Sequence, residues 1–332
     1  MSVSGKSDEV RLGFNCHGKG RVRMVKVIRH PDGLQEVMQV NVQLLLEGDI
    51  MGDAFRTGDN SNVVPTDTCK NTVYCLGKMH DFTAIEEFAI IICNHFLAEY
   101  PEIVNRISVE IVKDKWERIS NKNSAGRVQP HKHTFRRFGP YRPFAHAQGE
   151  RRYRTKEPAK ISMQAGFTGL EIMKTTQSGF TGFHKDRFTS LPEVKDRLVG
   201  TSVTATWHYA PDKIRSFTGK DYANVHKIVE DACIDEFAGP ADKGVYSASV
   251  QQTLYDMGKA AIVRNGTALT QITLEMPNIH NIPFDLTKYG FPADPPGVSP
   301  TIFYPIDEPH GMIKATVHSA STDKQSGYRA RL

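Results

Sequence analysis

The segment Gly58–Lys78 gathers side chains that could take part in chemistry at the start of one helix. Its sequence is GDNSNVVPTDTCKNTVYCLGK, in which a polar run gives way to two valines and Pro65 before Thr66 and Asp67. Because proline bars a helix upstream of itself and Thr and Asp favour N-cap positions, we expect a helix to begin here, with Thr66, Asp67 and Thr68 capping its first turn. One hypothesis is that the Thr66 hydroxyl faces a substrate. The alternative is a well-capped helix without a chemical role.

Hydrophobic patterning predicts the elements around this helix. Residues Arg21–Ile28 and Glu36–Leu46 alternate as strands do, and the HPDG sequence between them is typical of a tight turn, so they form a hairpin. Residues 83–86 (TAIE) match a capping box for a second helix that Pro101 closes, and Ile107–Ile111 alternates again. The side chains expected on the buried face of that second helix are Ile85, Phe88, Ala89, Ile92 and Phe96.

The second half of the chain repeats this order of elements. We expect Pro277 to end the last strand and Gly239 with Pro240 to stop the first helix. A strand pair, two helices and further strands, present twice, predict a duplicated α+β unit. The predicted strands are Ile161–Lys174, Thr201–Tyr209 and Leu269–Met276, and the predicted helices are Asn224–Phe237 and Ser247–Val263.

The stretch Arg127–Lys160 differs from the rest of the chain. It is rich in Arg, Pro and aromatic residues and has weak periodicity, so we place the domain boundary near its end. The predicted organisation is a first unit over residues 10–158, a second over 159–320 and a tail over 321–332.

This basic insert also supports a rival function, because arginines and aromatic rings together bind nucleic acid. Charge runs are more often solvated loops, however. His131 and His133 suggest a metal pair, yet no third ligand lies at suitable spacing nearby, so we interpret them as a strand or loop pair. The side chains that would serve nucleic-acid binding are Arg136, Arg137, Phe138, Tyr141, Arg142, Arg151, Arg152 and Tyr153.

The bulk composition is that of an ordinary soluble globular protein. The 332 residues are 39% hydrophobic and 24% charged, and the net charge of +5 favours anionic partners only mildly. The five cysteines show no C-x-x-C spacing, which indicates neither a disulfide framework nor a zinc site and favours a reducing compartment. No apolar run approaches the roughly 20 residues that span a bilayer, so we expect no membrane partner. Residues 265–267 (NGT) are expected to form a turn after a helix.

Five separated stretches of the chain carry a specific resemblance. In this order they resemble the urate oxidase (uricase) family, and they cover nearly the full length outside the basic insert and the two tails. One such motif alone would be weak, but five in the family's order identify the chain as similar to that family. The stretches are HGKGRVRMVKV, GDNSNVVPTDTCKNTVY, TTQSGFTGFHKDRFTSLPEVKDR, FAGPADKGVYSASVQQTLYDMG and LEMPNIHNIPFDLTKYG.

The resemblance implies the tunnelling fold, in which two tandem α+β units, each an antiparallel sheet with a helix pair, assemble as four subunits around a hollow barrel. It implies an active site between subunits, with Lys19 and Thr66 from one chain and the remaining residues from its neighbour. The implied partners are urate, O₂ and further copies of the chain in a homotetramer, without nucleic acid. A lone monomer is then expected to be inactive.

The implied reaction oxidises urate with O₂ and water to 5-hydroxyisourate and hydrogen peroxide, without metal or flavin. By resemblance, Lys19, Thr66 and His280 form a proton relay. A hydroxyl cannot deprotonate urate unaided, so a neutral lysine would draw the proton through Thr66, and a histidine can pass protons onward near neutral pH. Asn278 resembles the amide that, with Thr66, holds O₂ or water above the ring. For Lys19, between two glycines, the alternative is a solvated loop residue.

The remaining implied residues bind the flat anion. Arg197 would form two hydrogen bonds to one edge of urate; otherwise it is a surface residue on a helical turn, paired with Glu193. Phe180 would stack on the ring unless it is a core residue in a bend, and Phe183 is the nearby alternative. The opposite edge would meet the Gln251 side chain and the Val250 N–H, with the Asp67 N–H as a further donor.

The C-terminal Ala330-Arg331-Leu332 resembles a peroxisomal address, and peroxide as a product gives such routing a reason. Three residues form a weak signal, so the cytoplasm is the alternative location. A catalytically inactive structural relative is a third hypothesis, against which the complete set of matching site residues argues.

Overall fold

The structure is a computed structural model, and it describes residues 10–137, 139–152, 155, 157–293 and 300–320. Close contacts divide the chain into two compact units. The first contains the residues up to Arg136 together with Phe144–Met163, and the second contains Arg137–Pro143 together with the chain from Gln164 onward.

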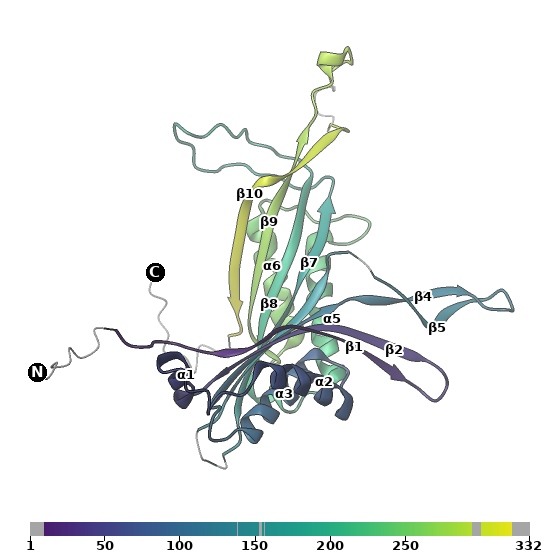
Figure 1. The fold of residues 1–332 in the computed structure, drawn as a ribbon. Coiled ribbons are helices and arrows are strands. Elements are labelled where there is room, and N and C mark those ends of the chain that lie inside the picture. Colours follow the sequence, from purple (N-terminus) through teal and green to yellow (C-terminus); the bar gives the residue numbers. More distant parts are fainter. Residues whose placement is uncertain (1–9, 138, 153–154, 156, 294–299, 321–332) are drawn as a thin grey trace, which may run out of the picture. The chain divides into compact units, whose positions relative to one another are not determined.

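The first unit is an antiparallel sheet that carries a helix pair (Figure 1). The chain adds a short helical turn after β2 and a separate two-stranded sheet, β4-β5, after β3. Strands follow the order β1-β2-β3-β6, and helices α2 and α3 contact β1 and β3 respectively. The elements are β1 (His17–Arg29), β2 (Gln35–Glu47), η1 (Asp49–Met51), α1 (Gly52–Arg56), α2 (Thr66–Met79), α3 (Ile85–Glu99), β3 (Arg106–Asp114), β4 (Trp116–Lys122), β5 (Val128–Arg137) and β6 (Arg142–Glu150).

Alternation places the core of this unit between sheet and helices. Along β2 every second side chain from Met38 to Leu46 is buried, which confirms the predicted hairpin partner. The predicted buried face of α3 is also confirmed, since all five of its residues are buried. Phe88 of α3 stacks on Phe82, with ring centroids 4.3 Å apart.

The capping predictions for both helices need correction. Residue Pro65 occupies the N-cap of α2, which has no side-chain capping hydrogen bond, because Thr66 is already the first helical residue. At α3 the carboxylate that accepts the N–H groups of Thr83 and Ala84, at 2.8 and 3.1 Å, belongs to Glu87, whereas Glu86 is buried. The predicted helices are therefore present, but their first turns are stabilised by other groups.

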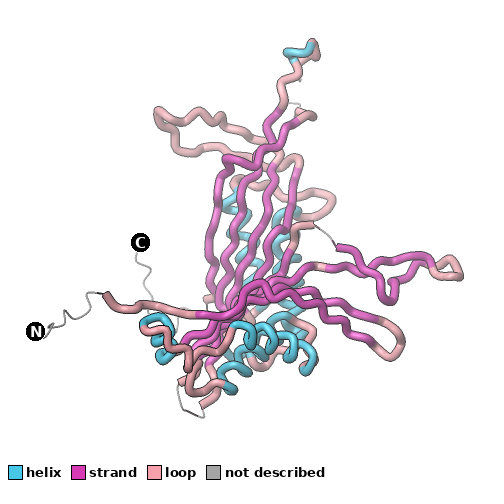
Figure 2. Tube along the Cα trace, viewed as in Figure 1, coloured by secondary structure: helices cyan, strands magenta, loops and turns pink. Residues whose placement is uncertain are grey.

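The second unit repeats the plan, with strands in the order β7-β8-β9-β10 and the helix pair α5 and α6 (Figure 2). Its core is aromatic: Phe167, Trp207 and Tyr222 are fully buried. Gly239 ends α5 with φ 69°, and Gly266 follows α6 with φ 56°, as the turn prediction at residues 265–267 requires. The elements are β7 (Lys160–Lys174), β8 (Val199–Tyr209), α4 (Pro211–Ile214), α5 (Gly219–Ala238), α6 (Val250–Asn265), β9 (Leu269–Pro283), η2 (Thr287–Tyr289) and β10 (Phe303–His318).

Proline 277 does not end β9, contrary to the prediction. The strand runs on to Pro283, and Pro277 lies opposite Met312 of β10. Pairing of β9 with β8 runs to Glu275 opposite Thr204 and resumes at Ile279 opposite Gly200. The proline thus sits in an interval of the β8 ladder, and the strand continues past it.

Candidate active site

In the first unit, Lys19 lies half-buried on β1 where the pairing with β2 is irregular. The register shifts between Lys19 and Val22, and Arg21 within the shift has φ 57°. Bulges of this kind re-aim side chains and are frequent beside active sites. The ring of His17, two residues earlier, hydrogen-bonds the Val64 carbonyl at 2.9 Å. The start of β1 is therefore attached to the segment that leads into α2.

Residues Thr66 and Asp67 are exposed on the first turn of α2, whose free N–H groups favour anions. The Asp67 carboxylate accepts hydrogen bonds from Lys70 at 2.5 Å and Asn71 at 2.8 Å. Lys70 lowers the pKa of Asp67, and Lys19 adds a smaller contribution of the same sign. The charge of Lys19 therefore acts on the first turn of α2. The Asp67 side chain serves the helix surface rather than the expected cap.

In the second unit, Phe180 and Arg197 are held together by backbone pairing. Phe180 exchanges both backbone hydrogen bonds with Val194, at 2.7 and 3.1 Å, and the Arg197 N–H donates to Ser178 at 2.8 Å. The guanidinium carbon lies 5.6 Å from the centre of the Phe180 ring. Phe183 stacks on Phe180 with ring centroids 4.8 Å apart. A flat anion that contacts the guanidinium would thus have an aromatic surface beside it.

Arg197 is not on a helical turn, which corrects one prediction. It lies in the irregular segment just before β8, and Glu193 pairs with Lys185 at 2.8 Å instead. The guanidinium is half-buried, and this burial lowers the pKa of Arg197. Within the described residues its Nε is buried without a hydrogen-bond partner. A buried cationic donor without a partner is what an incoming anion would satisfy.

The first turn of α6 joins the same region. Ser178 and Ser247 form a bridge, and the Gly179 N–H donates to the Ser247 carbonyl at 2.9 Å. Ser249 is the N-cap of α6, where its side chain accepts the Gln252 N–H at 3.2 Å, so the helix begins at Val250 rather than at the predicted Ser247. The next two residues are the predicted binding groups. Val250 is buried, and Gln251 is exposed.

Asn278 and His280 lie half-buried on β9, on either side of Ile279. Ile279 is opposite Gly200 of β8, three residues after Arg197 along the chain. Opposite them on β10 the register shifts between Ile306 and Gly311, so the strand is irregular here as well.

The nine predicted residues thus form two groups, each within one unit. Lys19, Thr66 and Asp67 belong to the first unit. The second unit holds Phe180, Arg197, Val250, Gln251, Asn278 and His280.

Several supporting residues escaped the sequence predictions. His17 holds the segment before Thr66, and Tyr246 donates to the Lys195 carbonyl at 2.9 Å. Asp196, directly before Arg197, accepts from Thr176 at 2.9 and 3.0 Å. These contacts join segments that are 20 to 51 residues apart, so no local pattern could have revealed them.

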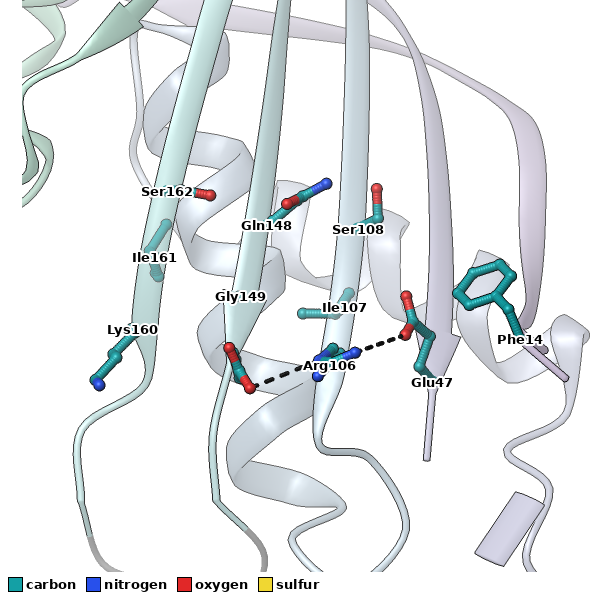
Figure 3. Close-up of a pocket in the computed structure, with 11 residues that line it drawn as sticks. Phe14, Glu47, Arg106, Ile107, Ser108, Gln148, Gly149, Lys160, Ile161 and Ser162 are labelled. Atoms are coloured by element: carbon teal, nitrogen blue, oxygen red, sulfur yellow. Dashed lines mark ion pairs between the residues drawn. The ribbon is translucent and has the colours of Figure 1, made fainter. Parts of the chain in front are cut away.

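A cavity of about 510 Å³ lies elsewhere in the first unit (Figure 3). Arg106 stands between Glu47 and Glu150, at 3.7 and 3.6 Å, and Ser108 hydrogen-bonds His146 at 2.8 Å. The positive charge of Arg106 is already balanced by these two carboxylates. The cavity is therefore a poorer anion site than the region around Arg197. None of the nine predicted residues lines it.

Several polar side chains of the basic insert have partners within the chain. Arg151 donates to the carbonyls of Thr155 and Leu97, and the Tyr141 hydroxyl donates to Glu230 at 2.9 Å. Arg136, Arg137 and Arg142 have interaction partners, while Phe138 and Tyr153 lie outside the described residues. The insert contains strands β5 and β6 rather than a loop, and it does not support the nucleic-acid alternative.

The described residues include neither a candidate metal centre nor a membrane-spanning helix. No group of three or more His, Cys, Asp or Glu side chains could hold a metal ion there. His131 and His133 are a strand pair on β5 with ring centroids 4.6 Å apart, as expected. No helix in the same part of the chain has the length and apolar character needed to cross a membrane.

Comparison with known proteins gives one consistent family. The Uricase family model matches residues 15–148 and 163–314, a span that includes all nine predicted site residues. The chain belongs to the uricase family. The Uricase of Arabidopsis thaliana is 37% identical over 319 residues, which is 95% of this chain and 98% of the relative. The Uricase of Dictyostelium discoideum is also 37% identical, over 91% of this chain and 96% of the relative.

The fold of a solved uricase agrees with that of this chain. The crystal structure of the uricase from Arthrobacter globiformis superposes with a TM-score of 0.79 at 32% identity, over 98% of both chains. The predicted α+β fold, with tandem antiparallel sheets and helix pairs, is therefore confirmed for this member of the uricase family.

Proposed function

We propose that this chain is a urate oxidase that converts urate, O₂ and water to 5-hydroxyisourate and hydrogen peroxide. The observation that carries the proposal is the half-buried guanidinium of Arg197 beside the Phe180 ring, with its Nε buried and unpartnered within the described residues. Such a group suits a flat anion, because it supplies a planar fork of donors next to a stacking surface.

Each binding residue has a distinct part in this proposal. Arg197 donates to a carbonyl oxygen and a deprotonated nitrogen on one edge of urate, and the Gln251 amide with the Val250 N–H meets the other edge. Phe180 cushions the ring, a contact that contributes on the order of 1 to 3 kcal/mol per base in nucleic-acid systems. The Asp67 N–H, on the first turn of α2, adds a donor where the helix dipole favours negative charge.

The proton relay in this proposal consists of Lys19, Thr66 and His280. Urate must lose a further proton while its electrons pass to O₂. The Thr66 hydroxyl receives that proton and relays it to the Lys19 amine, and His280 exchanges protons onward. Asn278, with Thr66, holds O₂ and then water at the ring face. The products balance as one 5-hydroxyisourate and one peroxide per urate, without a metal or flavin as an electron carrier.

The active site is proposed to lie between subunits of a homotetramer. The division of the predicted residues supports this proposal, because Lys19, Thr66 and Asp67 form one group and the remaining six form another in the second unit. Co-expression of Lys19→Met and Arg197→Met chains tests it. A hybrid pair holds one intact site and one doubly altered site, so random pairing restores about a quarter of the parent's activity. If each site lies within a single chain, the mixture stays as inactive as either variant.

The activity itself is tested on purified protein freed of metal by chelation and shown to lack flavin absorbance. We expect it to bleach the ultraviolet band of urate while one O₂ is consumed and one peroxide formed per urate. Arg197→Met should lose most of this activity, whereas Arg264→Met should keep it, since Arg264 forms a surface pair with Asp235 at 2.5 Å. A correctly assembled sample without bleaching and O₂ uptake would refute the proposal.

For location we propose the peroxisome, with the cytoplasm as the alternative. The support is the C-terminal Ala330-Arg331-Leu332, which lies outside the described residues. A fluorescent fusion that keeps this C-terminus should co-localise with peroxisomes, and one that lacks the last three residues should not. Diffuse signal from both fusions would contradict the proposal.

A further inference from the structure

Gln177 occupies an unusual backbone conformation beside the candidate site. Its φ of 60° lies in the left-handed region, which residues other than glycine rarely adopt. Such a residue persists only when its surroundings fix it, and these positions cluster at functional sites. Gln177 lies three residues before Phe180 in the segment TTQSGF.

Hydrogen bonds on one side connect Gln177 to the segment that carries Arg197. The Gln177 N–H donates to the Asp196 carboxylate at 2.8 Å, and the Thr176 hydroxyl donates to the same carboxylate. The next residue completes the connection, because the Ser178 carbonyl accepts the Arg197 N–H at 2.8 Å. The backbone at Gln177 and Ser178 is therefore hydrogen-bonded to both Asp196 and the Arg197 N–H, which fixes the position of Arg197.

Two other hydrogen bonds connect Gln177 to the segment that leads into α6. The Ser247 N–H donates to the Gln177 carbonyl at 2.9 Å, and the Gln177 side-chain amide donates to the Lys243 carbonyl at 2.9 Å. A side-chain carbon at Gly244 would lie only 2.3 Å from the Gln177 Oε1, so the glycine permits this close approach. Ser247 in turn lies three residues before Val250.

We propose that Gln177 is a positioning residue that sets the spacing between Arg197 and the start of α6. Its backbone bonds both segments, and its left-handed conformation is what directs its N–H towards Asp196 and its carbonyl towards Ser247. The inference rests on the proposed function, in which Arg197 meets one edge of urate and Val250 with Gln251 meets the other. A change at Gln177 therefore alters the distance between Arg197 and the start of α6 without removing any of the groups that bind urate.

Three substitutions of Gln177 distinguish the effect of its backbone conformation from the effect of its side-chain hydrogen bond. Gln177→Asn keeps a residue type that tolerates positive φ but shortens the amide, so it loses the Lys243 contact alone. Gln177→Gly accepts the conformation and also loses that contact. Gln177→Val cannot hold the conformation, because a β-branched side chain is a strong outlier at positive φ, so both segments must shift.

The experiment measures steady-state kinetics and, under argon, urate binding in the absence of turnover. We expect KM and the anaerobic Kd for urate to rise together, by about threefold to fivefold for Asn and Gly and by more than about tenfold for Val. The kcat should stay within about twofold, since Lys19 and Thr66 are untouched. Gln129→Val is the matched control, because Gln129 is an exposed β5 residue with a side-chain amide contact to Asn123.

A purely structural role predicts another pattern. In that case Gln177→Val lowers the melting temperature while the KM and Kd of the folded enzyme match the parent, which would overturn the inference. If the Val variant does not fold, the Asn and Gly variants decide, and unchanged KM and Kd in both overturn it as well. An inactive parent that binds no urate would instead refute the proposed function, and this inference with it.

Discussion

Replacing Arg197 by lysine tests the edge-on grip on urate while the positive charge is kept. The structure makes the change local. The Arg197 N–H bond to Ser178 belongs to the backbone and survives, and a lysine ammonium can still lie near the Phe180 ring, which is 5.6 Å from the present guanidinium carbon. What disappears is the planar fork, because an ammonium is a point charge that cannot bind two atoms of one edge in parallel.

The magnitude follows from the loss of one of two charge-assisted hydrogen bonds. A hydrogen bond to a charged group contributes about 1.5 to 3 kcal/mol, and every 1.4 kcal/mol corresponds to about a factor of ten. We therefore expect KM for urate to rise by about 10- to 100-fold. Burial of the site keeps the effect near the upper part of this range, since the guanidinium is half-buried and its Nε has no partner among the described residues.

The assay follows urate absorbance at several urate concentrations in air-saturated buffer and measures urate binding under argon. Both KM and the anaerobic Kd should increase, with kcat nearly unchanged. Arg264→Lys is the control, because its partners Asp235 and Glu236 lie on the surface and its replacement should change KM by less than about twofold.

Two results would refute this reasoning. A KM for Arg197→Lys within about threefold of the parent would show that the fork does not bind urate. A large fall in kcat with an unchanged anaerobic Kd would place Arg197 in transition-state stabilisation rather than in substrate binding.

Three further predictions concern other parts of the molecule. Gly179→Ala should raise KM about tenfold, because the new carbon would lie 2.1 Å from the Tyr246 hydroxyl and close to two backbone oxygens that cannot move freely; an unchanged KM would show that this packing is soft. Lys19→Met should lower kcat at least about tenfold with little change in the anaerobic Kd, and full turnover would disprove the relay. Cys93 should resist alkylation at pH 8, because burial raises its pKa to about 12 and leaves it a neutral thiol, whereas the exposed Cys75 should react; mass spectrometry of the labelled native protein distinguishes the two.

Local patterning accounts for the elements that the sequence predicted correctly. The hairpin of β1 and β2 and the buried face of α3 follow from side-chain period, since alternation and 3.6-residue spacing decide which side chains face a core. The family resemblance was equally visible, because its five motifs are contiguous stretches and each of the nine candidate residues lies within one of them.

The sequence predictions were wrong where contacts with residues distant in the sequence outweighed the local sequence preference. Proline usually breaks strands because it lacks an N–H, but Pro277 lies in an interval of the β8 ladder and opposite Met312 of β10, and β9 continues past it. Glu193 has the right spacing for a helical pair with Arg197, yet Lys185 takes it and no helix forms.

The sequence alone therefore determined the fold class and the family and named the candidate binding groups, because these follow from residue types and short spacings. Only the tertiary structure showed that Arg197 is half-buried beside Phe180, and that Gln177 bonds both the Arg197 segment and the segment before α6. Those contacts join residues 17 to 70 positions apart. Their geometry depends on how the loops between distant segments close, and the periodicity of hydrophobic residues along the sequence carries no information about that.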